Sequence, residues 1–500
     1  MELKHYLAKY FQFDDFRPGQ RETIESVMEK RHTISMLPTG TGKSLCYQLP
    51  GYLLTGPVLV VSPLLSLMQD QVEQMMAMGE KRVIALNSFL STQQKAQALE
   101  QLEKFKYIFI SPEMLGIDSV LDRLKKLAVS LYVVDEAHCI SQWGYDFRPD
   151  YLKLGEYRKK LGQPLTLALT ATATKEVRRD IAEKLCLEEW NEVVYSVDRP
   201  SISLALEQAS SFQEKLERTA DLVKLLKGPG IIYFSSKKVA EQTAAHLREK
   251  GSKNVMAYHG GLDSESRILI QQQFINGQLD VVCATSAFGM GINKDNVRYV
   301  IHFHMPMQIE SYLQEIGRAA RDGLDSIAIL LYSPGDEQLA YQLAEAELPD
   351  QYQLERLFGF LVDHHIPYHS LSERAEELSM MCGFTEIQWR IVEEYLTNIK
   401  DVHYKTDLES MQRLIENRLS VKKQKIRSML DWIQTKECKR AVILEMFNEE
   451  LTEKPVNCCS TCGIYIEHYK ETESSIEHKE TVMDWKSDLA SILLISERIE

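Results

Sequence analysis

Residues 33–44 read TISMLPTGTGKS, and this stretch decides the fold. A short run of β-favouring and apolar residues leads into a loop with two glycines, and a helical pattern follows. In this order of strand, loop and helix, backbone N–H groups at the helix N-terminus bind phosphate. The Lys43 ammonium would reach the β- and γ-phosphates, and the Ser44 hydroxyl would hold Mg²⁺. The stretch predicts an α/β nucleotide-binding domain whose binding residues are Thr39, Gly40, Thr41, Gly42, Lys43 and Ser44.

Similar short apolar runs alternate with helical segments on both sides of this loop, as far as residue 335. Runs of this length with helical spacers are typical of parallel sheets. The alternation is interrupted near residues 198–215, which predicts two separate sheets. The runs lie at 33–37, 58–62, 107–111, 131–135 and 165–169 before the interruption, and at 230–236, 255–259, 280–285, 299–303 and 328–332 after it.

A second apolar run, at 131–138, reads LYVVDEAH and contains two adjacent carboxylates. Ligands of open α/β sheets bind at the carboxyl ends of strands, which is where these side chains would lie. Asp135 would hold Mg²⁺ through water, and Glu136 would polarise the attacking water. An ordinary exposed strand end is the alternative, but the phosphate-binding loop earlier in the chain argues against it.

A third motif, at 314–321, reads QEIGRAAR. Arg318 and Arg321 are three residues apart and are predicted to share one helix face. An arginine of the second sheet domain that faced the nucleotide would stabilise charge developing on the γ-phosphate. Catalysis would then require the two domains to close, which converts hydrolysis into domain motion. A solvated basic face is the alternative.

In this order, the motifs resemble those of RecQ-family DNA helicases of superfamily two. The resemblance covers residues 1–335 and again about 410–465. It implies two tandem RecA-like domains and ATP-driven translocation 3′ to 5′ on DNA. Its motifs are FRPGQ (16–20), LPTGTGKSLCYQLP (37–50), VVSPLLSLMQDQV (60–72), FISPEML (109–115), VVDEAHCISQWGYDFRPDY (133–151), ALTATAT (168–174), YHGGL (258–262), ATSAFGMGINK (284–294) and ESYLQEIGRAARDG (310–323).

The resemblance also implies roles for individual side chains. It assigns a coupling role to His138 and Gln314. It assigns phosphate contacts to Arg318 and Arg321, with Arg321 as the expected arginine finger. Adenine recognition falls to three residues near the N-terminus, Phe13, Arg17 and Gln20.

Three aromatic residues alternate along residues 141–148, which read SQWGYDFR. Trp143, Tyr145 and Phe147 beside Arg148 could form an exposed loop on which unpaired bases stack. A buried aromatic strand is the alternative. The family uses this segment to sense single-stranded DNA and signal to the ATP site, and it usually has His where this chain has Tyr145.

Small hydroxyl residues follow several of the predicted strands. Hydroxyls and neighbouring N–H groups suit phosphate contacts rather than base edges, so we expect little sequence preference. Each such residue could instead be a turn or cap residue. The predicted contacts to the DNA backbone are Ser62, Ser111, Ser235 and Thr285.

Four of the nine cysteines crowd near the C-terminus. Cys459 and Cys462 have the spacing of a zinc knuckle, and Cys438 precedes them. In a chain without an export signal, such a cluster indicates a metal rather than disulfides. Cys458 is the expected fourth ligand, with His468 as the alternative. The site would hold one structural Zn²⁺ with no catalytic role.

Residues 336–408 have a helical pattern and suggest a winged-helix-like insertion. Thr385 and Gln388 form a predicted capping box that opens a helix, and 402–406 reads as a strand of the wing. The inner face of that helix is predicted to carry Ile387, Ile391 and Tyr395.

Charge distinguishes this insertion from the segment that follows it. Residues 347–408 carry five basic against twelve acidic residues, so phosphate repulsion argues against a duplex reader. We expect a spacer, a protein-docking module or a wedge that steers the duplex. Residues 410–442 carry nine basic against three acidic residues and are the best candidate for a DNA-backbone patch, although a solvated face is equally consistent.

The whole composition is that of an ordinary globular protein. The chain has 500 residues, 44% of them apolar, which is too long for one core and too apolar for a mainly disordered chain. A net charge of −14 excludes a basic footprint over the whole chain. The N-terminus lacks the apolar core of a signal peptide, so we expect a cytoplasmic location, associated with the nucleoid in a bacterium.

These observations predict an α/β fold of two RecA-like parallel-sheet domains, followed by a mainly helical region with a zinc-binding module. The predicted segments are 1–205 and 206–335 for the two RecA-like domains, 336–408 for the insertion, 409–470 for a helical hairpin with the zinc-binding module, and 471–500 for a C-terminal helix.

The function expected from the motifs is that of an ATP-dependent DNA helicase of short RecQ type. Its cofactors would be ATP, Mg²⁺ and one structural Zn²⁺. Its partners would be single-stranded DNA, tailed duplexes and junctions, together with proteins of DNA repair, recombination or replication. An RNA helicase is the second interpretation, because DEAH boxes occur there too. A nucleic-acid-binding regulator without unwinding activity is the third, and the intact ATP motifs argue against it.

Overall fold

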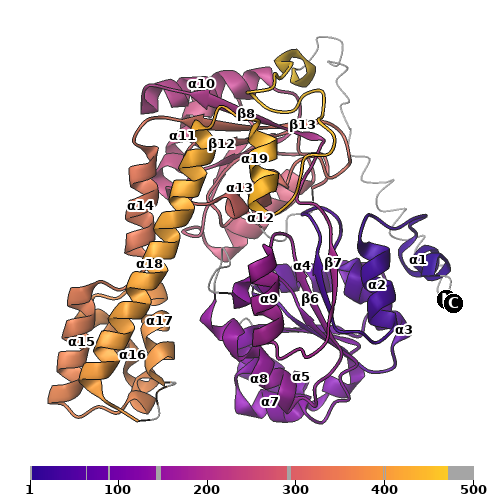
Figure 1. Cartoon of the computed structure of the whole chain (residues 1–500). Helices are drawn as coiled ribbons and strands as arrows, with labels where there is room; N and C mark the ends of the chain where they lie inside the picture. Colours follow the sequence, from indigo (N-terminus) through magenta and orange to yellow (C-terminus); the bar gives the residue numbers. More distant parts are fainter. Residues whose placement is uncertain are drawn as a thin grey trace.

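The computed structural model describes residues 3–63, 65–87, 90–141, 148–289, 294–397, 399 and 401–470. Two parallel sheets, each with flanking helices, form two domains, and a helical region lies alongside them (Figure 1). Trp143, Tyr145, Phe147 and the predicted C-terminal helix at 471–500 lie outside the described residues. No helix within the described ranges is long and apolar enough to cross a membrane.

The first sheet has seven parallel strands in the order β3-β4-β2-β5-β6-β1-β7. Five of them are buried along their whole length, as continuous apolar runs in a sheet covered on both faces should be. The strands are β1 (Thr33–Met36), β2 (Val58–Val61), β3 (Val83–Leu86), β4 (Tyr107–Ile110), β5 (Leu131–Val134), β6 (Thr166–Thr170) and β7 (Asn191–Val194). The helices are α1 (Leu3–Phe11), α2 (Gln20–Met28), α3 (Leu45–Leu53), α4 (Leu65–Ala77), α5 (Thr92–Glu100), α6 (Pro112–Leu115), α7 (Asp118–Leu124), α8 (Leu154–Lys160) and α9 (Lys175–Lys184).

The second sheet has six parallel strands in the order β10-β11-β9-β12-β13-β8. It begins at Ile202, inside the interruption predicted near 198–215, because β8 pairs with β13 along its full length. The strands are β8 (Ile202–Gln208), β9 (Gly230–Tyr233), β10 (Val255–Tyr258), β11 (Val281–Ala284), β12 (Tyr299–His302) and β13 (Ser326–Tyr332). The helices are α10 (Phe212–Leu225), α11 (Lys237–Glu249), α12 (Ser264–Ile275) and α13 (Ile309–Ile316).

A single long helix organises the rest of the chain. α18 (Tyr404–Gln434) has 31 residues, so it is about 46 Å long at 1.5 Å per residue. It packs on α15 at one end and on α13 and α14 at the other, and it thereby joins a small helical module to the second sheet domain (Figure 1). The other helices of this region are α14 (Asp336–Ala346), α15 (Gln351–Asp363), α16 (Ala375–Cys382), α17 (Glu386–Thr397) and α19 (Lys439–Met446).

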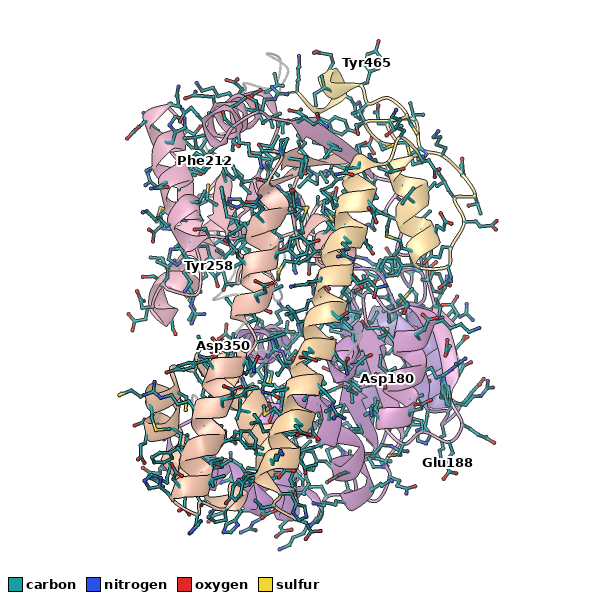
Figure 2. All side chains as sticks on the ribbon, turned by 60° about the vertical axis from the view of Figure 1, so that its left-hand side comes forward. Asp180, Glu188, Phe212, Tyr258, Asp350 and Tyr465 are labelled. Carbon is teal, nitrogen blue, oxygen red and sulfur yellow. The ribbon has the colours of Figure 1, made fainter. Side chains whose placement is uncertain are left out.

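The helical module, formed by α15–α17 and the first half of α18, has a hydrophobic core of its own. Asp350 lies between α14 and α15, at the entrance to the module, and caps α15 through a capping box with Gln353 (Figure 2). The predicted strand at 402–406 is wrong, because Tyr404 begins α18. Five residues are too few for periodicity to separate a strand from the start of a helix.

The capping box of α17 is confirmed, and the predicted inner face is right at Ile391 and Tyr395 but wrong at Ile387. The Thr385 N–H donates to Gln388 Oε1 at 2.9 Å, and the Gln388 N–H donates to Thr385 Oγ1 at 3.3 Å. Ile387 is 59% exposed. The buried apolar side chains are Trp389, Val392 and Leu396, and Ile391 and Tyr395 are partly buried against the same core. The face that α17 turns toward the module's core therefore includes two of the predicted residues and is centred on Trp389, Val392 and Leu396.

Candidate functional site

The phosphate-binding loop has the predicted strand–loop–helix context. β1 ends at Met36, and α3 begins at Leu45, directly after Ser44. Gly40 and Gly42 have φ angles of +86° and +73°, a backbone region that favours glycine. Lys43 and Ser44 therefore lie at a helix N-terminus, where backbone N–H groups are available to an anion.

This loop borders a cavity of about 520 Å³ between the two sheet domains. A volume of this size is typical of small-molecule sites. Two predicted residues, Thr41 and His138, do not line it. The predicted residues that do are Phe13, Arg17, Gln20, Thr39, Gly40, Gly42, Lys43, Ser44, Asp135 and Glu136 from the first domain, and Gln314, Arg318 and Arg321 from the second.

The two carboxylates follow β5 directly. Asp135 Oδ1 accepts a hydrogen bond from the Glu136 N–H at 3.0 Å. Burial raises the pKa of Asp135, and the nearby Lys43 ammonium opposes that rise. Glu136 has a φ of +48°, a left-handed conformation that costs a non-glycine residue about 1–3 kcal/mol. Strain of this kind aims the Glu136 side chain in a direction that an ordinary strand end would not allow.

His138 lies behind Glu136. Its Nδ1 is 3.4 Å from Glu136 Oε2 and 3.0 Å from Thr170 Oγ1, at the end of β6. The imidazole is 1% exposed. Burial, followed by the charges of Lys43 and Arg148, lowers the pKa of His138 well below its usual value, so the ring is neutral at pH 7. His138 therefore touches the carboxylate without lining the cavity.

The arginines Arg318 and Arg321 do not share a helix face, so that prediction is wrong. α13 ends at Ile316, and both side chains lie on the turn that follows, where Ala320 has a φ of +55°. Burial, followed by the charge of Arg318, lowers the pKa of Arg321 to about 9. The buried Nε of Arg318 makes no hydrogen bond to any described residue. Two buried cations at one cavity favour an anionic ligand.

The turn that carries these arginines touches the phosphate-binding loop of the first domain. A Cβ atom on Gly40 would lie 2.9 Å from Arg321 Cγ. A Cβ atom on Gly317 would overlap the Thr39 side chain. An alanine at either position would therefore require the side chain of Arg321 or of Thr39 to shift. The two sheet domains are in contact at this edge of the cavity.

The three residues expected to recognise adenine lie at one end of the same cavity. Phe13 is 53% exposed. Arg17 donates to the carbonyl of Gly40. The Gln20 amide donates to the carbonyls of Thr41 and Gly42 at 2.7 and 3.0 Å. In this structure, Arg17 and Gln20 therefore hold the phosphate-binding loop.

The predicted hydroxyl contacts lie at the carboxyl ends of strands in both sheets. The buried Ser62 Oγ makes no hydrogen bond among the described residues, and Arg148 donates to the neighbouring Pro63 carbonyl at 2.8 Å. Ser111 caps α6 through its hydroxyl, which is the alternative role. Ser235 and Thr285 follow β9 and β11, which are neighbours in the second sheet.

The four cysteines come together as a candidate zinc site. Their Sγ atoms all lie within 4.8 Å of one another, with 3.6 Å between Cys438 and Cys458 and 3.9 Å between Cys438 and Cys459. Four thiolates around a tetrahedral zinc lie about 3.8 Å apart, given Zn–S bonds of about 2.3 Å. His468 instead pairs with Asp325 at 2.9 Å. The four cysteines Cys438, Cys458, Cys459 and Cys462 therefore form a donor set that fits Zn²⁺.

The basic run at 410–442 is largely engaged within the protein. Lys422 and Lys423 pair with Glu347 and Glu345 beside α14. Lys425 pairs with Glu310 of α13 at 3.1 Å. These lysines attach α18 to its neighbours through ion pairs, whereas the sequence predicted that they would contact the DNA backbone.

Comparison with known proteins agrees with this arrangement. The DEAD/DEAH box helicase family matches residues 17–180, the helicase conserved C-terminal domain matches 214–323, and the RecQ zinc-binding domain matches 405–464. The chain is 44% identical over 493 residues to the probable ATP-dependent DNA helicase RecS of Bacillus subtilis (strain 168), covering 98% of both chains. The chain belongs to the RecQ family of DNA helicases. This RecQ-family chain is also 40% identical to the ATP-dependent DNA helicase RecQ of Haemophilus influenzae, over 71% of its own length and 58% of the relative's.

Solved structures support the fold of this RecQ-family chain. Mycobacterium smegmatis helicase Lhr, bound to single-stranded DNA and AMP-PNP, has a TM-score of 0.56 at 17% identity, covering 86% of this chain and 57% of that chain. S. cerevisiae Dbp5, bound to RNA and ADP BeF3, has a TM-score of 0.55 at 17% identity, covering 84% and 97%. The predicted fold class, two RecA-like domains with a helical region and a zinc-binding module, is confirmed.

Sequence reasoning missed Arg199, which contacts the phosphate-binding loop without lining the cavity. Arg199 donates to the Thr39 carbonyl at 2.6 Å and to the Ala320 carbonyl at 2.7 Å. It belongs to the segment near residues 198–215 that interrupts the pattern of apolar runs. The acceptors are backbone carbonyls far away in sequence, so no side-chain pattern could have indicated the contact.

Proposed function

We propose that this RecQ-family chain hydrolyses ATP to move 3′ to 5′ along single-stranded DNA and unwind duplexes. One observation carries the proposal. Arg321 of the second domain lies against Gly40 of the phosphate-binding loop, in a cavity that also holds Lys43 and two carboxylates. A site built from both domains ties hydrolysis to their relative position.

Each chemical role in ATP hydrolysis has a candidate residue at this cavity. Lys43 would neutralise the β- and γ-phosphates. Ser44 and Asp135 would hold Mg²⁺, which neutralises charge on the phosphate oxygens when bound. Glu136 would orient and polarise the attacking water, held by its strained backbone. Arg321 would stabilise charge on the γ-phosphate as it leaves, because the buried guanidinium has no solvent to screen it.

Movement along DNA would follow from the same geometry. The γ-phosphate would draw Arg321 and the loop together, and its release would let the domains separate. Ser62 and Ser111 on one sheet, with Ser235 and Thr285 on the other, would hold two points of the DNA backbone. Repeated closing and opening between those points gives directional steps. The contact between His138 and Glu136 would carry the signal from DNA bound near Arg148.

DNA is favoured over RNA as the substrate because the named relatives are DNA helicases. The solved structures do not decide this point, since similar folds are bound to DNA and to RNA. We propose roles in repair, recombination or replication on the same grounds. The complete set of ATP-site residues argues against a regulator without unwinding activity.

A comparison of tailed duplexes tests the proposal. The full chain should unwind a duplex with a 3′ single-stranded tail and leave one with a 5′ tail intact. Its ATPase should be stimulated by single-stranded DNA more than by RNA of the same length. Glu136→Gln, which keeps the size of the side chain, should bind ATP without unwinding. Stimulation by RNA alone, or unwinding from the 5′ tail, would contradict the proposal.

A further inference from the structure

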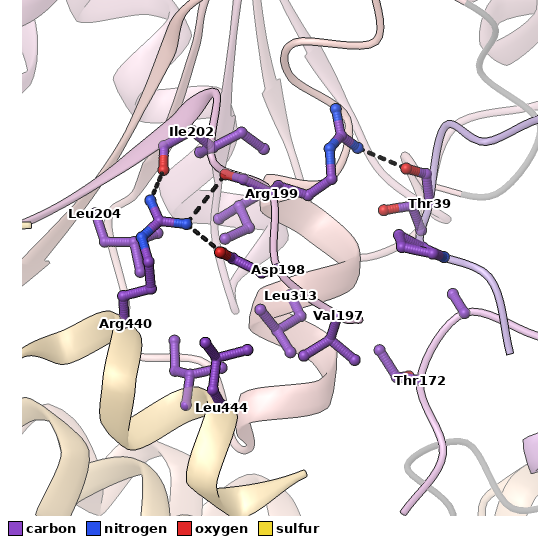
Figure 3. A pocket seen from close by; sticks show the side chains of 14 residues that line it. Thr39, Thr172, Val197, Asp198, Arg199, Ile202, Leu204, Leu313, Arg440 and Leu444 are labelled. Atoms are coloured by element: carbon purple, nitrogen blue, oxygen red, sulfur yellow. Dashed lines mark hydrogen bonds and ion pairs between the residues drawn. The ribbon is translucent and has the colours of Figure 1, made fainter. Parts of the chain in front are cut away.

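Three parts of the molecule meet at residues 197–202, the segment between the two sheets. On one side lies the phosphate-binding loop, on a second side α13, which leads into the turn that carries Arg321, and on a third side α19 of the zinc-binding module (Figure 3). A cavity of about 30 Å³ is lined by residues of the phosphate-binding loop, of α13 and of α19. Asp198 and Arg199 are the charged residues of the segment.

Arg199 connects the two sheet domains through the two arms of its guanidinium. One arm, Nη1, donates to the Thr39 carbonyl at 2.6 Å. The other, Nη2, donates to the carbonyls of Ala319 and Ala320 at 3.1 and 2.7 Å. A rigid, planar fork can hold acceptors on two sides in this way, whereas a lysine ammonium offers a single point.

The Ala320 carbonyl, which accepts a hydrogen bond from Arg199, belongs to a constrained part of the backbone. Ala320 has a left-handed φ of +55° and is 2% exposed. Such a conformation persists only where neighbouring contacts hold it. Arg321 is the next residue, so the hydrogen bond from Arg199 fixes the backbone that presents Arg321 to the phosphate-binding loop.

Arg440, the second residue of α19, holds the same segment from the zinc-binding side. It donates to the Asp198 carboxylate, to the Arg199 carbonyl at 3.1 Å and to the Ile202 carbonyl (Figure 3). A further hydrogen bond of 3.4 Å reaches the carbonyl of Cys458, one of the four clustered cysteines. Arg440 is 2% exposed, so its charge depends on these partners.

A second contact joins the end of α18 to α13, the helix that precedes this turn. The Trp432 indole N–H donates to the Lys439 carbonyl at 2.8 Å, which fixes the end of α18 to the start of α19. The Trp432 ring packs on Tyr312 of α13, with ring centroids 5.0 Å apart. α13 leads directly into the turn that carries Arg321.

We propose that Arg440 and Arg199 are positioning residues that transmit the placement of the zinc-binding module to the arginine finger. Arg440 holds the segment at 197–202 in place, and Arg199 then fastens the turn before Arg321 to the phosphate-binding loop. Neither residue borders the 520 Å³ cavity, so neither is expected to touch the nucleotide. The inference rests on the proposed ATPase function and names what sets the geometry of that site.

Steady-state kinetics of single variants in the full-length, zinc-loaded chain test the proposal. Arg199→Gln should lower the DNA-stimulated kcat about ten- to hundredfold, because a displacement of the order of 1 Å has that effect. The KM for ATP, the zinc content and the DNA affinity should change less than twofold. Arg218→Gln is the matched control, since Arg218 makes a two-armed pair with Glu207 inside the second domain.

Arg199→Lys keeps the positive charge but removes the planar fork, so it shows which of the two is needed. If the fork is what matters, the lysine variant should be nearly as slow as the glutamine variant. Full activity of either variant would overturn the proposal. Arg440→Gln should slow turnover with zinc retained, and the double variant should be no slower than Arg199→Gln alone, because the two residues act in series. Multiplicative losses would show that they act separately.

Hydrogen exchange gives a readout that does not depend on ATPase activity. The amides of residues 317–323 should exchange about tenfold faster in Arg199→Gln and Arg440→Gln than in the wild type, and unchanged in Arg218→Gln. Should Arg440→Gln fail to fold, Asp198→Asn breaks the same link from the other side. If the wild type lacks ATPase activity, the proposed function fails, and unchanged exchange in the Arg199 variants would overturn this inference on its own.

Discussion

The second half of the chain meets the first sheet domain at two places that differ in chemistry. Near Arg199 and Arg440 the contact is buried, and backbone carbonyls accept most of the hydrogen bonds. Between α17 and the first domain, Arg390 pairs with Glu113 at 3.1 Å and with Asp150 at 2.7 Å, all partly exposed to solvent. Exposed ion pairs contribute little, about 0–1 kcal/mol, and salt screens them.

This difference indicates separate tasks for the two contacts. A buried contact with fixed acceptors keeps its geometry and suits the ATP site, which needs positions held within a fraction of an ångström. An exposed ionic contact can open at little cost. The helical module, with a core of its own, is therefore attached firmly through α18 and only loosely to the first domain.

The largest effect is expected at the ATP site itself, next to the buried contact. Lys43→Ala removes the cation assigned to the phosphates, and Glu136→Gln removes the group assigned to the attacking water. Each should lower kcat by about 10² or more, and Glu136→Gln should still bind nucleotide. Arg321→Ala should lose turnover more than ATP affinity, because its contact forms between domains. Near-normal turnover in steady-state assays would contradict the assignment.

The next largest effect is expected at the zinc-binding module, because its residue Arg440 holds the segment that forms the buried contact. Elemental analysis should find about one zinc per chain. Cys459→Ser should lower the melting temperature and slow ATP turnover, because α19 begins beside this cluster and carries Arg440. Nucleotide affinity should change less. A stable, active chain without zinc would show that the four cysteines do not form a structural site.

The sequence predicted the buried sheet strands but missed three edge strands. β3, β7 and β8 each lie at the edge of a sheet. Edge strands are covered less completely, and polar residues interrupt β7 (NEVV) and β8 (ISLALEQ). β3 reads VIAL, so its omission has no such cause, and the fourth edge strand, β10, was predicted. Strands buried on both faces have no such interruption, which is why the alternation of apolar runs indicated them.

The candidate ATP site could be predicted from its motifs because its chemistry requires particular side chains at fixed spacing. The structure brings Lys43, Asp135, Glu136 and Arg321 to one cavity. The turn after α13 and the role of Arg199 could not be predicted, since both depend on backbone contacts between distant segments. The prediction of a strand at 402–406, where α18 begins, was wrong for a different reason. Five residues are too few to show whether the periodicity is that of a strand or of a helix.

A smaller effect is expected at the exposed contact. Arg390→Ala removes the pairs with Glu113 and Asp150, and the melting temperature should change by no more than a few degrees. Single-strand binding and stimulated ATPase should stay within about twofold of the wild type, with any loss confined to unwinding of forked duplexes. Raising the salt concentration should reproduce the variant's effect in the wild type. A tenfold loss of ATPase would show that this contact, like the buried one, serves the ATP site.

The smallest effect is a pH dependence of the same exposed contact. Burial raises the pKa of Glu394 to about 7, and Lys153, Arg418 and Arg390 oppose the rise while Asp150 adds to it. The folded chain therefore holds this proton more tightly than the unfolded chain, whose glutamate pKa is about 4.3. The stabilisation from Glu394 is complete below that value and is lost as the pH rises through about 7.

Glu394→Gln isolates this contribution, because glutamine stays neutral over the whole range. In the wild type, the melting temperature measured against pH should fall between about pH 5 and 7 by an amount that the variant does not show. The loss should amount to about 1 kcal/mol or less, since the side chain is partly exposed and its charge is screened. The matched control is Glu386→Gln, an exposed glutamate on the first turn of the same helix. If the melting temperature falls equally with pH in the wild type and in both variants, Glu394 is not the group that titrates. Salt would then be the only condition of the two that weakens the contact of α17 with the first domain.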